Sequence, residues 1–225
     1  MSGRMLSTEE ARRVYDRIGA RQDTQAFYED PAVDAMLAAA GFDAATAVVE
    51  LGCGTGRLAA RLLGGVMPAG AAYRGFDASP VMVALATRRT APFGARASVA
   101  LVDGAGPLPA AAGEADRFLS TYVLDLFPEA AILAAVADAA RIVTPGGFLC
   151  LAGLAEGTGP VSRAVMASWR AVHRLRPGLV GGCRPVRLAR FVQGPVWEIV
   201  LDRTVVSWGV PSEALVARRT GAEAA

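Results

Sequence analysis

The stretch from Val48 to Gly56 reads Val-Val-Glu-Leu-Gly-Cys-Gly-Thr-Gly and constrains the fold more than any other part of the chain. An apolar run that ends in an acidic residue is typical of a buried strand. The glycines that follow at every second position adopt positive φ without steric cost and let a ligand lie against bare backbone. The residues after Gly56 have helical periodicity, so the loop opens onto a helix N-terminus with free N–H groups. The stretch therefore predicts a strand, a ligand-binding loop and a helix.

The spacing of these glycines and a nearby carboxylate indicate the kind of ligand. Dinucleotide folds use G-x-G-x-x-G, whereas the glycines at 52, 54 and 56 give G-x-G-x-G. Glu50 would repel a pyrophosphate but can accept hydrogen bonds from a cationic amino-acid group. S-adenosylmethionine (SAM) carries such an ammonium group and no phosphate. The stretch resembles motif I of the class I SAM-dependent methyltransferases; an ordinary strand–turn–helix with glycines for tight packing is the alternative.

The composition is that of one globular domain. The chain has 225 residues, 53% of them hydrophobic, and no apolar run approaches the roughly 18 residues of a membrane span. The first ten residues lack the apolar core of a signal peptide, and the cysteines, three in number, are far apart, so we expect a cytoplasmic protein without disulfides or a metal site. The net charge is +2, and the densest basic cluster, Arg184, Arg187 and Arg190, is expected on one face of a helix. A solvated face is favoured over a nucleic-acid site.

Apolar runs alternate with helical patterns along the rest of the chain, which predicts a mostly parallel sheet with right-handed crossovers. Expected strands are Ala47–Leu51, Ala72–Phe76, Ser98–Val102, Arg117–Thr121, Phe148–Ala152, Trp197–Leu201 and Glu213–Ala217. Expected helices are Arg57–Leu63, Pro80–Arg89, Glu129–Val143 and Val161–Leu175. The last two strands are separated by a short gap that suggests an antiparallel pair. The order resembles the Rossmann-like class I methyltransferase fold, an α/β fold of seven strands with the last reversed and helices on both faces.

Residues at the ends of the second and third strands carry the resemblance further. Asp77, in Tyr-Arg-Gly-Phe-Asp-Ala-Ser-Pro, can accept hydrogen bonds from both ribose hydroxyls, although it could also cap the following helix. Ala78 and Met82 would then border the adenine. The resemblance implies that Asp103 takes the exocyclic amine of the adenine while the N–H of Gly104 reaches a ring nitrogen; a simple Asp-Gly turn is the alternative.

Two further segments resemble the family. Residues 116–125 resemble motif IV, where the fourth strand ends beside the transferred methyl group, and residues 141–149 resemble the structural turn before the fifth strand. The segment Tyr15–Tyr28 looks like the lid of small-molecule methyltransferases related to ubiquinone and menaquinone biosynthesis enzymes, in which Arg21 could meet the SAM carboxylate. The chain departs from those enzymes around motif IV, so their substrate is not carried over. We therefore expect an N-terminal helical lid (1–40) and a SAM-binding domain (41–225) with an acceptor-site insertion at about 153–190.

These observations predict a SAM-dependent methyltransferase of small organic molecules, with S-adenosylhomocysteine (SAH) as product, acting as a monomer or homodimer. His173, the only histidine, and Tyr122 are the candidate catalytic residues. The residues expected to contact the cofactor are Tyr15, Arg21, Glu50, Gly52, Cys53, Gly54, Thr55, Gly56, Asp77, Ala78, Ser79, Met82, Asp103, Gly104, Ser120, Thr121 and Tyr122. The residues expected to contact the acceptor are Gln22, Tyr28, Asp125, Trp169, Arg184 and Arg187. A catalytically silent SAM-binding or SAH-binding protein and a nicotinamide-dependent oxidoreductase are the alternatives.

Overall fold

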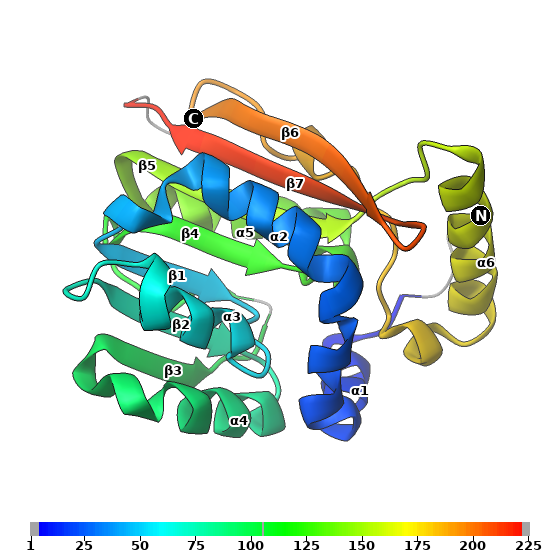
Figure 1. The fold of residues 1–225 in the computed structure, drawn as a ribbon, viewed down its shortest axis with the longest axis horizontal. Coiled ribbons are helices and arrows are strands. Elements are labelled where there is room, and N and C mark those ends of the chain that lie inside the picture. Colours follow the sequence, from blue (N-terminus) through cyan, green and yellow to red (C-terminus); the bar gives the residue numbers. More distant parts are fainter. Residues whose placement is uncertain (1–4, 105, 222–225) are drawn as a thin grey trace.

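The computed structural model describes residues 5–104 and 106–221, which form one seven-stranded sheet with helices on both faces (Figure 1). The strand order is β3-β2-β1-β4-β5-β7-β6. The strands are β1 (Ala47–Leu51), β2 (Ala72–Asp77), β3 (Ala97–Leu101), β4 (Ala115–Thr121), β5 (Val143–Leu154), β6 (Trp197–Ser207) and β7 (Val210–Arg219).

The first five strands pair in parallel, and the reversed strand β7 is inserted between β5 and β6. A two-residue turn, Trp208-Gly209, joins β6 to β7, which explains the short gap between the two final apolar runs. The predicted fold class, a mostly parallel Rossmann-like sheet with the last strand antiparallel, is confirmed. The carboxyl ends of β1, β2 and β4 consequently meet at one edge, where this topology places ligands.

Helices cover both faces of the sheet, and one further helix lies beyond the carboxyl ends of the strands. Helix α2 crosses the face formed by β5, β7 and β6, and α5 lies behind the sheet (Figure 1). Helix α1 stands against α4 beyond the carboxyl ends of the strands. The helices are α1 (Thr8–Ile18), α2 (Ala26–Ala40), α3 (Arg57–Arg61), α4 (Pro80–Thr90), α5 (Glu129–Ile142) and α6 (Pro160–Leu175). Shorter turns of helix are η1 (Gly19–Gln25), η2 (Phe42–Ala44), η3 (Leu62–Val66), η4 (Ala91–Arg96), η5 (Leu124–Leu126), η6 (Pro177–Val180) and η7 (Leu188–Arg190).

Alternating side chains of the central strands build two separate cores, as the period of two in a strand requires. Val48 and Leu119 pack with residues of α2 and α3, whereas their neighbours Val49 and Phe118 pack with residues of α5. Because both faces are covered, the strands read as nearly continuous apolar runs, which is why their positions could be predicted. None of the described helices is both long enough and apolar enough to cross a membrane.

The structure corrects the prediction that Arg184, Arg187 and Arg190 share a helix face. Only Leu188–Arg190 forms a single 3₁₀ turn, and the residues before it are irregular. The carboxylate of Glu213 accepts the backbone N–H groups of Leu188 at 2.8 Å and Ala189 at 3.0 Å, so these donors are satisfied without a longer helix.

Candidate active site

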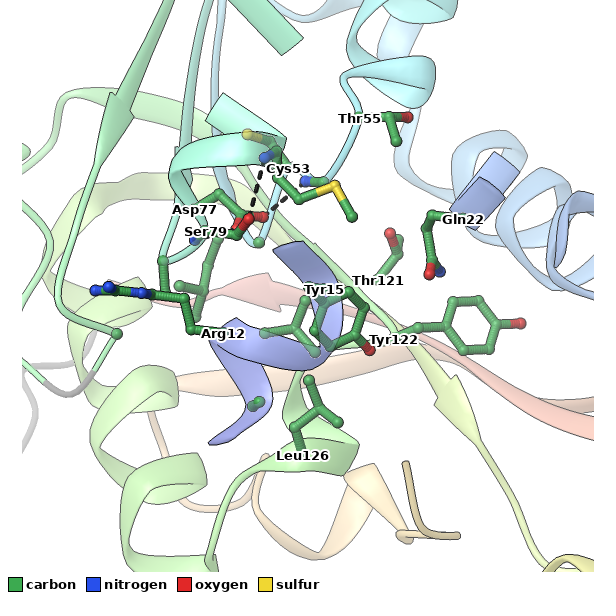
Figure 2. Close-up of a pocket in the computed structure, with 18 of the residues that line it drawn as sticks. Arg12, Tyr15, Gln22, Cys53, Thr55, Asp77, Ser79, Thr121, Tyr122 and Leu126 are labelled. Carbon is green, nitrogen blue, oxygen red and sulfur yellow. Dashed lines mark hydrogen bonds between the residues drawn. The ribbon is translucent and has the colours of Figure 1, made fainter. Parts of the chain in front are cut away.

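A cavity of about 180 Å³ lies at the carboxyl ends of β1, β2 and β4. One wall comes from the sheet side: the β1–α3 loop, the β2–α4 loop and the residues that follow β3 and β4. The other wall comes from the N-terminal segment, which we define as residues 6–29 and which includes α1, η1 and the start of α2. Figure 2 shows Cys53, Asp77 and Ser79 on one side of the cavity and Gln22 on the other.

The three glycines of the β1–α3 loop meet different surroundings although all have positive φ. A Cβ on Gly52 would lie 2.1 Å from Cγ2 of Val123, and one on Gly56 would lie 2.7 Å from Cα of Ala86. A Cβ on Gly54 would meet no atom within 4 Å. Gly52 and Gly56 are therefore required by packing, whereas Gly54 leaves bare backbone beside the cavity for a ligand.

Asp77, at the end of β2, is held by the backbone of the two loops. Its Oδ2 accepts the N–H of Gly54 at 2.8 Å, and its Oδ1 accepts the N–H of Ser79 at 2.9 Å. Burial raises the pKa of the Asp77 carboxyl, and the backbone N–H groups act against this rise. Each carboxylate oxygen can accept a second hydrogen bond, so Asp77 retains the capacity to bind two ribose hydroxyls.

Glu50 lies deeper in the same wall and is 1% exposed. Its Oε2 accepts the hydroxyl of Tyr73 at 2.5 Å. Burial raises the pKa of Glu50 to about 8, with a further contribution from the neighbouring Asp77. A cation in the cavity would favour the charged carboxylate, which matches the expected contact with the ammonium of SAM.

Helix α1 covers the cavity without burying any of its own residues. Ser7 and Glu10 form a capping box that fixes where the helix begins. Ala11 and Tyr15, one helical turn apart, line the cavity. Because an isolated helix of this length is marginal in water, contacts across the cavity contribute to its stability. The arrangement fits a helix that closes over a bound molecule.

Three groups of side-chain contacts fasten the N-terminal segment, together with Asp30 directly after it, to the sheet side. Asp16 accepts the hydroxyl of Ser79 at 2.5 Å. Asp23 accepts the hydroxyl of Thr55 at 2.5 Å and pairs with Arg89 at 2.8 Å, while Arg89 also donates to Thr55. These hydrogen bonds lower the pKa of Asp23 despite its partial burial.

The third contact joins α2 to α3. Arg57 donates to both carboxylate oxygens of Asp30, at 3.0 and 2.7 Å. Such bidentate pairs fix the geometry as well as the distance between two elements. Side-chain hydrogen bonds and ion pairs to both loops of the sheet side thus position the N-terminal segment.

Tyr122, directly after β4, has a φ of 55°, an uncommon conformation for a large side chain. Its N–H donates to the carbonyl of Ala152 at 2.7 Å, and its hydroxyl donates to Ser212 at 2.8 Å. Burial raises the pKa of the Tyr122 hydroxyl. Strained backbone of this kind persists where surrounding contacts hold it, and it clusters at functional sites.

The structure brings most of the expected cofactor residues to the cavity lining. These are Tyr15, Glu50, Gly52, Cys53, Gly54, Thr55, Asp77, Ala78, Ser79, Met82, Gly104, Thr121 and Tyr122. Arg21, Gly56, Asp103 and Ser120 are outside the lining. Arg21 and Asp103 are exposed, and the Ser120 hydroxyl donates to the carbonyl of Leu51 at 3.0 Å. The roles expected for these residues stay predictions.

Of the expected acceptor residues, Gln22 lines the cavity and the others do not. Tyr28 donates its hydroxyl to Gln25, and Trp169 donates its indole N–H to the carbonyl of Cys183. Arg184 donates to the carbonyl of Phe127, and Arg187 pairs with Asp202 and Glu213. Asp125 is 1% exposed and accepts the N–H of Leu154.

His173, the other candidate base, is also outside the cavity lining. It is buried near the end of α6, where Nε2 lies 3.1 Å from the carbonyl oxygen of Gly182. This contact attaches α6 to the segment that follows it. The catalytic role expected for His173 stays a prediction.

Glu29 lines the cavity and is 8% exposed, although it was not among the residues predicted from the sequence. The signal for it lies in the helical spacing, since Ala32, Val33 and Met36 follow Glu29 by three, four and seven residues and are all buried. Burying a carboxylate costs free energy unless a hydrogen-bond donor or a positive charge pairs with it. Arg12, Asp23, Arg57, Leu126 and Phe127 also line the cavity without having been predicted.

Part of the chain is similar to a known protein family. A model of the methyltransferase domain family matches residues 48–147. No curated protein matches the sequence significantly. The cyclase SpnF has 16% identity and a TM-score of 0.72, with 97% of this chain and 99% of SpnF covered.

Two other solved structures are similar over nearly the whole chain. An O-methyltransferase family protein from Burkholderia thailandensis has 19% identity and a TM-score of 0.68, with 96% of this chain and 60% of that chain covered. Magnesium protoporphyrin IX methyltransferase from Synechocystis PCC 6803, solved with bound SAH, has 21% identity and a TM-score of 0.62, with 98% of this chain and 90% of that chain covered. At these identities the likeness shows the fold.

The residues present fit the cofactor of that family. Gly54 leaves open backbone beside the cavity, Asp77 can accept two more hydrogen bonds, and Glu50 is a buried carboxyl that a cation would stabilise. The match to the family model begins in β1 and includes the whole glycine loop. Residues 48–147 match the methyltransferase domain family, and the chain shares the fold of solved methyltransferase structures.

Proposed function

We propose that this protein binds SAM in the cavity and transfers its methyl group to a small organic molecule. The observation that carries the proposal is the arrangement of Gly54 and Asp77, in which open loop backbone and a carboxylate with spare acceptor capacity lie side by side. A nucleoside needs both a flat surface to lie on and an acceptor for its ribose hydroxyls. Glu50, at the inner end of the same wall, is the acceptor for the ammonium of the cofactor.

The chemistry divides between the cofactor and the protein. When bound, SAM supplies an activated methyl group, so the protein contributes alignment, exclusion of water and, where needed, a proton acceptor. Asp77 and Gly54 hold the nucleoside end, while Tyr15 on α1 closes the cavity from the opposite wall. Orientation of two bound reactants alone is worth roughly 7–11 kcal/mol of the barrier, so a strong catalytic base is not required.

Calorimetric titration with SAM, SAH and NAD tests the proposal. We expect SAM and SAH to bind and NAD not to bind. Asp77→Asn should weaken SAH binding by about 1–3 kcal/mol, because the amide N–H₂ cannot accept the bonds that the carboxylate accepts. Asp43→Asn, at an exposed position in η2, is the matched control and should leave affinity unchanged. NAD binding without SAM binding would overturn the proposal in favour of an oxidoreductase.

A SAM-binding protein without methyl transfer is the second candidate. The likeness to the cyclase SpnF favours keeping it, because that protein has this fold over its whole length and is named for a cyclisation. A screen of hydroxyl, phenol and amine acceptors, read as SAH release, separates the two. SAH release with any acceptor supports methyl transfer, whereas SAM binding with no release across the screen supports the second candidate.

A further inference from the structure

Two buried side-chain oxygens at the N-terminal wall of the cavity have no hydrogen-bond partner among the residues that the structure describes. They are Oε1 of Gln22 and Oε1 of Glu29, and both residues line the cavity. Buried polar atoms are nearly always hydrogen-bonded, so a pair left over in a cavity indicates groups that a ligand satisfies. Figure 2 shows Gln22 on the N-terminal side of the cavity.

The hydrogen bonds around Gln22 make its oxygen the free atom. Gln25 Oε1 accepts two hydrogen bonds, one from the hydroxyl of Tyr28 and one from Nε2–H of Gln22, each at 3.0 Å. The amide nitrogen of Gln22 is therefore engaged, and its oxygen remains available. The oxygen of Gln22 is an acceptor, and Oε1 of Glu29 is one when the carboxyl is charged, so the ligand group that suits both is a hydrogen-bond donor.

Glu29 faces charged groups from several elements. Its Oε2 lies 3.9 Å from Arg57 of α3, but Arg57 is already paired bidentately with Asp30 of α2. Asp23 of η1 and Asp125 of η5 add negative charge nearby. Burial is the largest cause that raises the pKa of Glu29 to about 8, and Arg57 opposes it. A carboxyl with this pKa can take up a proton near neutral pH.

The cavity thus has two acidic residues, Glu50 and Glu29, with separate surroundings. Glu50 interacts with Tyr73 and Asp77, at the end that the proposed function gives to the cofactor. Glu29 interacts with Arg57, Asp125 and other charges of the N-terminal wall. Since the cofactor carries one ammonium group and Glu50 serves it, Glu29 is left for the second substrate.

We propose that Glu29, together with Gln22, receives the O–H or N–H group of the methyl acceptor, which makes the acceptor a small alcohol, phenol or amine. The inference rests on the proposed function and names the substrate class of that site. The acceptor's oxygen or nitrogen lone pair forms the new bond to the methyl carbon, and the pair of the broken carbon–sulfur bond stays on sulfur. The proton released from the acceptor goes to a carboxylate oxygen of Glu29, so that atoms and charge balance.

The test follows Glu29 directly, without turnover. Full-length protein labelled with ¹³C at the glutamate Cδ is saturated with SAH and titrated with phenol or with its methyl ether, anisole, while carboxyl resonances are recorded against pH. Glu29→Gln assigns the Glu29 signal. We expect phenol, but not anisole, to shift this signal and to lower the pKa of Glu29, because a donated hydrogen bond stabilises the charged carboxylate.

Binding measurements give the second readout. Phenol should bind the SAH complex about tenfold more tightly than anisole, and Glu29→Met should remove most of that preference, because methionine keeps the length of the side chain without its acceptor. Asp30→Asn is the matched control: it disturbs the same arginine from the same helix at a position outside the cavity lining, and the preference should persist.

Three outcomes would overturn the inference. One is an equal preference for phenol in Glu29→Met and in the unchanged protein. Another is a Glu29 signal that responds to SAH alone and not to phenol, which would assign Glu29 to the cofactor. The third is no binding of phenol or benzylamine at millimolar concentration. SAH binding is measured first and independently, so loss of SAH binding would count against the proposed function and not against the role of Glu29.

Discussion

The two walls of the cavity are held by different kinds of contact. On the sheet side, backbone groups fix the geometry: the N–H groups of Gly54 and Ser79 donate to Asp77, across 23 and 2 residues of sequence. On the N-terminal side, side chains do so, with Asp16 and Asp23 reaching Ser79 and Arg89 across 63 and 66 residues. The first wall depends on turn conformation, and the second depends on side-chain hydrogen bonds and an ion pair that can open separately.

This difference between the walls lets the site admit ligands without unfolding. Backbone hydrogen bonds between adjacent strands and loops open only when the sheet unfolds, whereas partly exposed ion pairs open at small free energies. We therefore expect the sheet wall to be a fixed surface and the N-terminal segment to be the part that moves away from it. Substitutions in one wall or the other test this difference.

The largest effect is expected from alanine in the glycine loop. Gly52→Ala should lower the free energy of unfolding by about 3–4 kcal/mol, because its Cβ would overlap Val123 and its φ is 76°. Gly54→Ala should lower it by about 1 kcal/mol from backbone strain alone, yet weaken SAH binding strongly. Urea unfolding and calorimetry of the two variants measure this contrast. Equal stability losses would contradict the division between packing and ligand contact.

The pH dependence of stability compares one carboxyl from each wall. The pKa values of Glu50 and Glu29 are both raised to about 8, so the folded chain holds more protons than the unfolded chain between about pH 4.5 and 8. Unfolding free energy should therefore fall as pH rises through this window, by up to about 1.4 kcal/mol per pH unit for each group. Thermal unfolding of Glu50→Gln and Glu29→Gln should each show a weaker pH slope. A slope unchanged in both variants would contradict the raised pKa values.

A smaller and local effect is expected at Arg89, which pairs with Asp23 and Thr55. Arg89→Met should open the N-terminal segment more often, by about 1 kcal/mol, since the pair is partly exposed. Amide hydrogen exchange should speed up about fivefold in α1 and η1 and stay unchanged in β1 and β4. Faster exchange throughout the sheet would show that the two walls open together.

The smallest effect is expected at Arg61, whose pair with Asp34 joins α3 to α2 on the surface. The side chains of Arg61 and Asp34 are 40% and 54% exposed. Arg61→Gln should change the free energy of unfolding by less than about 0.5 kcal/mol and leave SAH affinity unaltered. Urea unfolding and calorimetry check both values. A loss comparable to that of Arg89→Met would mean that surface pairs of α2 also hold the cavity wall.

The sheet side could be predicted from sequence because its signals are local. The predicted strand Ala47–Leu51 matches β1, and the glycine loop and Asp77 follow from spacing within a few residues of strand ends. Residues of the N-terminal wall could be predicted only in part. Tyr15 and Gln22 line the cavity, whereas Arg21, one residue away, is exposed, because η1 rather than a continuous α-helix sets the direction of these side chains.

By itself the sequence determined the order of strands and helices, the reversed final strand and the loop that meets a ligand, because strand period and glycine conformation depend on neighbours along the chain. Only the tertiary structure decided which distant side chains meet. It brought Glu29 and Gln22 to the lining of one cavity and placed His173 against the carbonyl of Gly182, outside that lining. Helical spacing puts Glu29 on the buried face of α2, but which polar groups meet it there is set by packing between elements, which spacing does not encode.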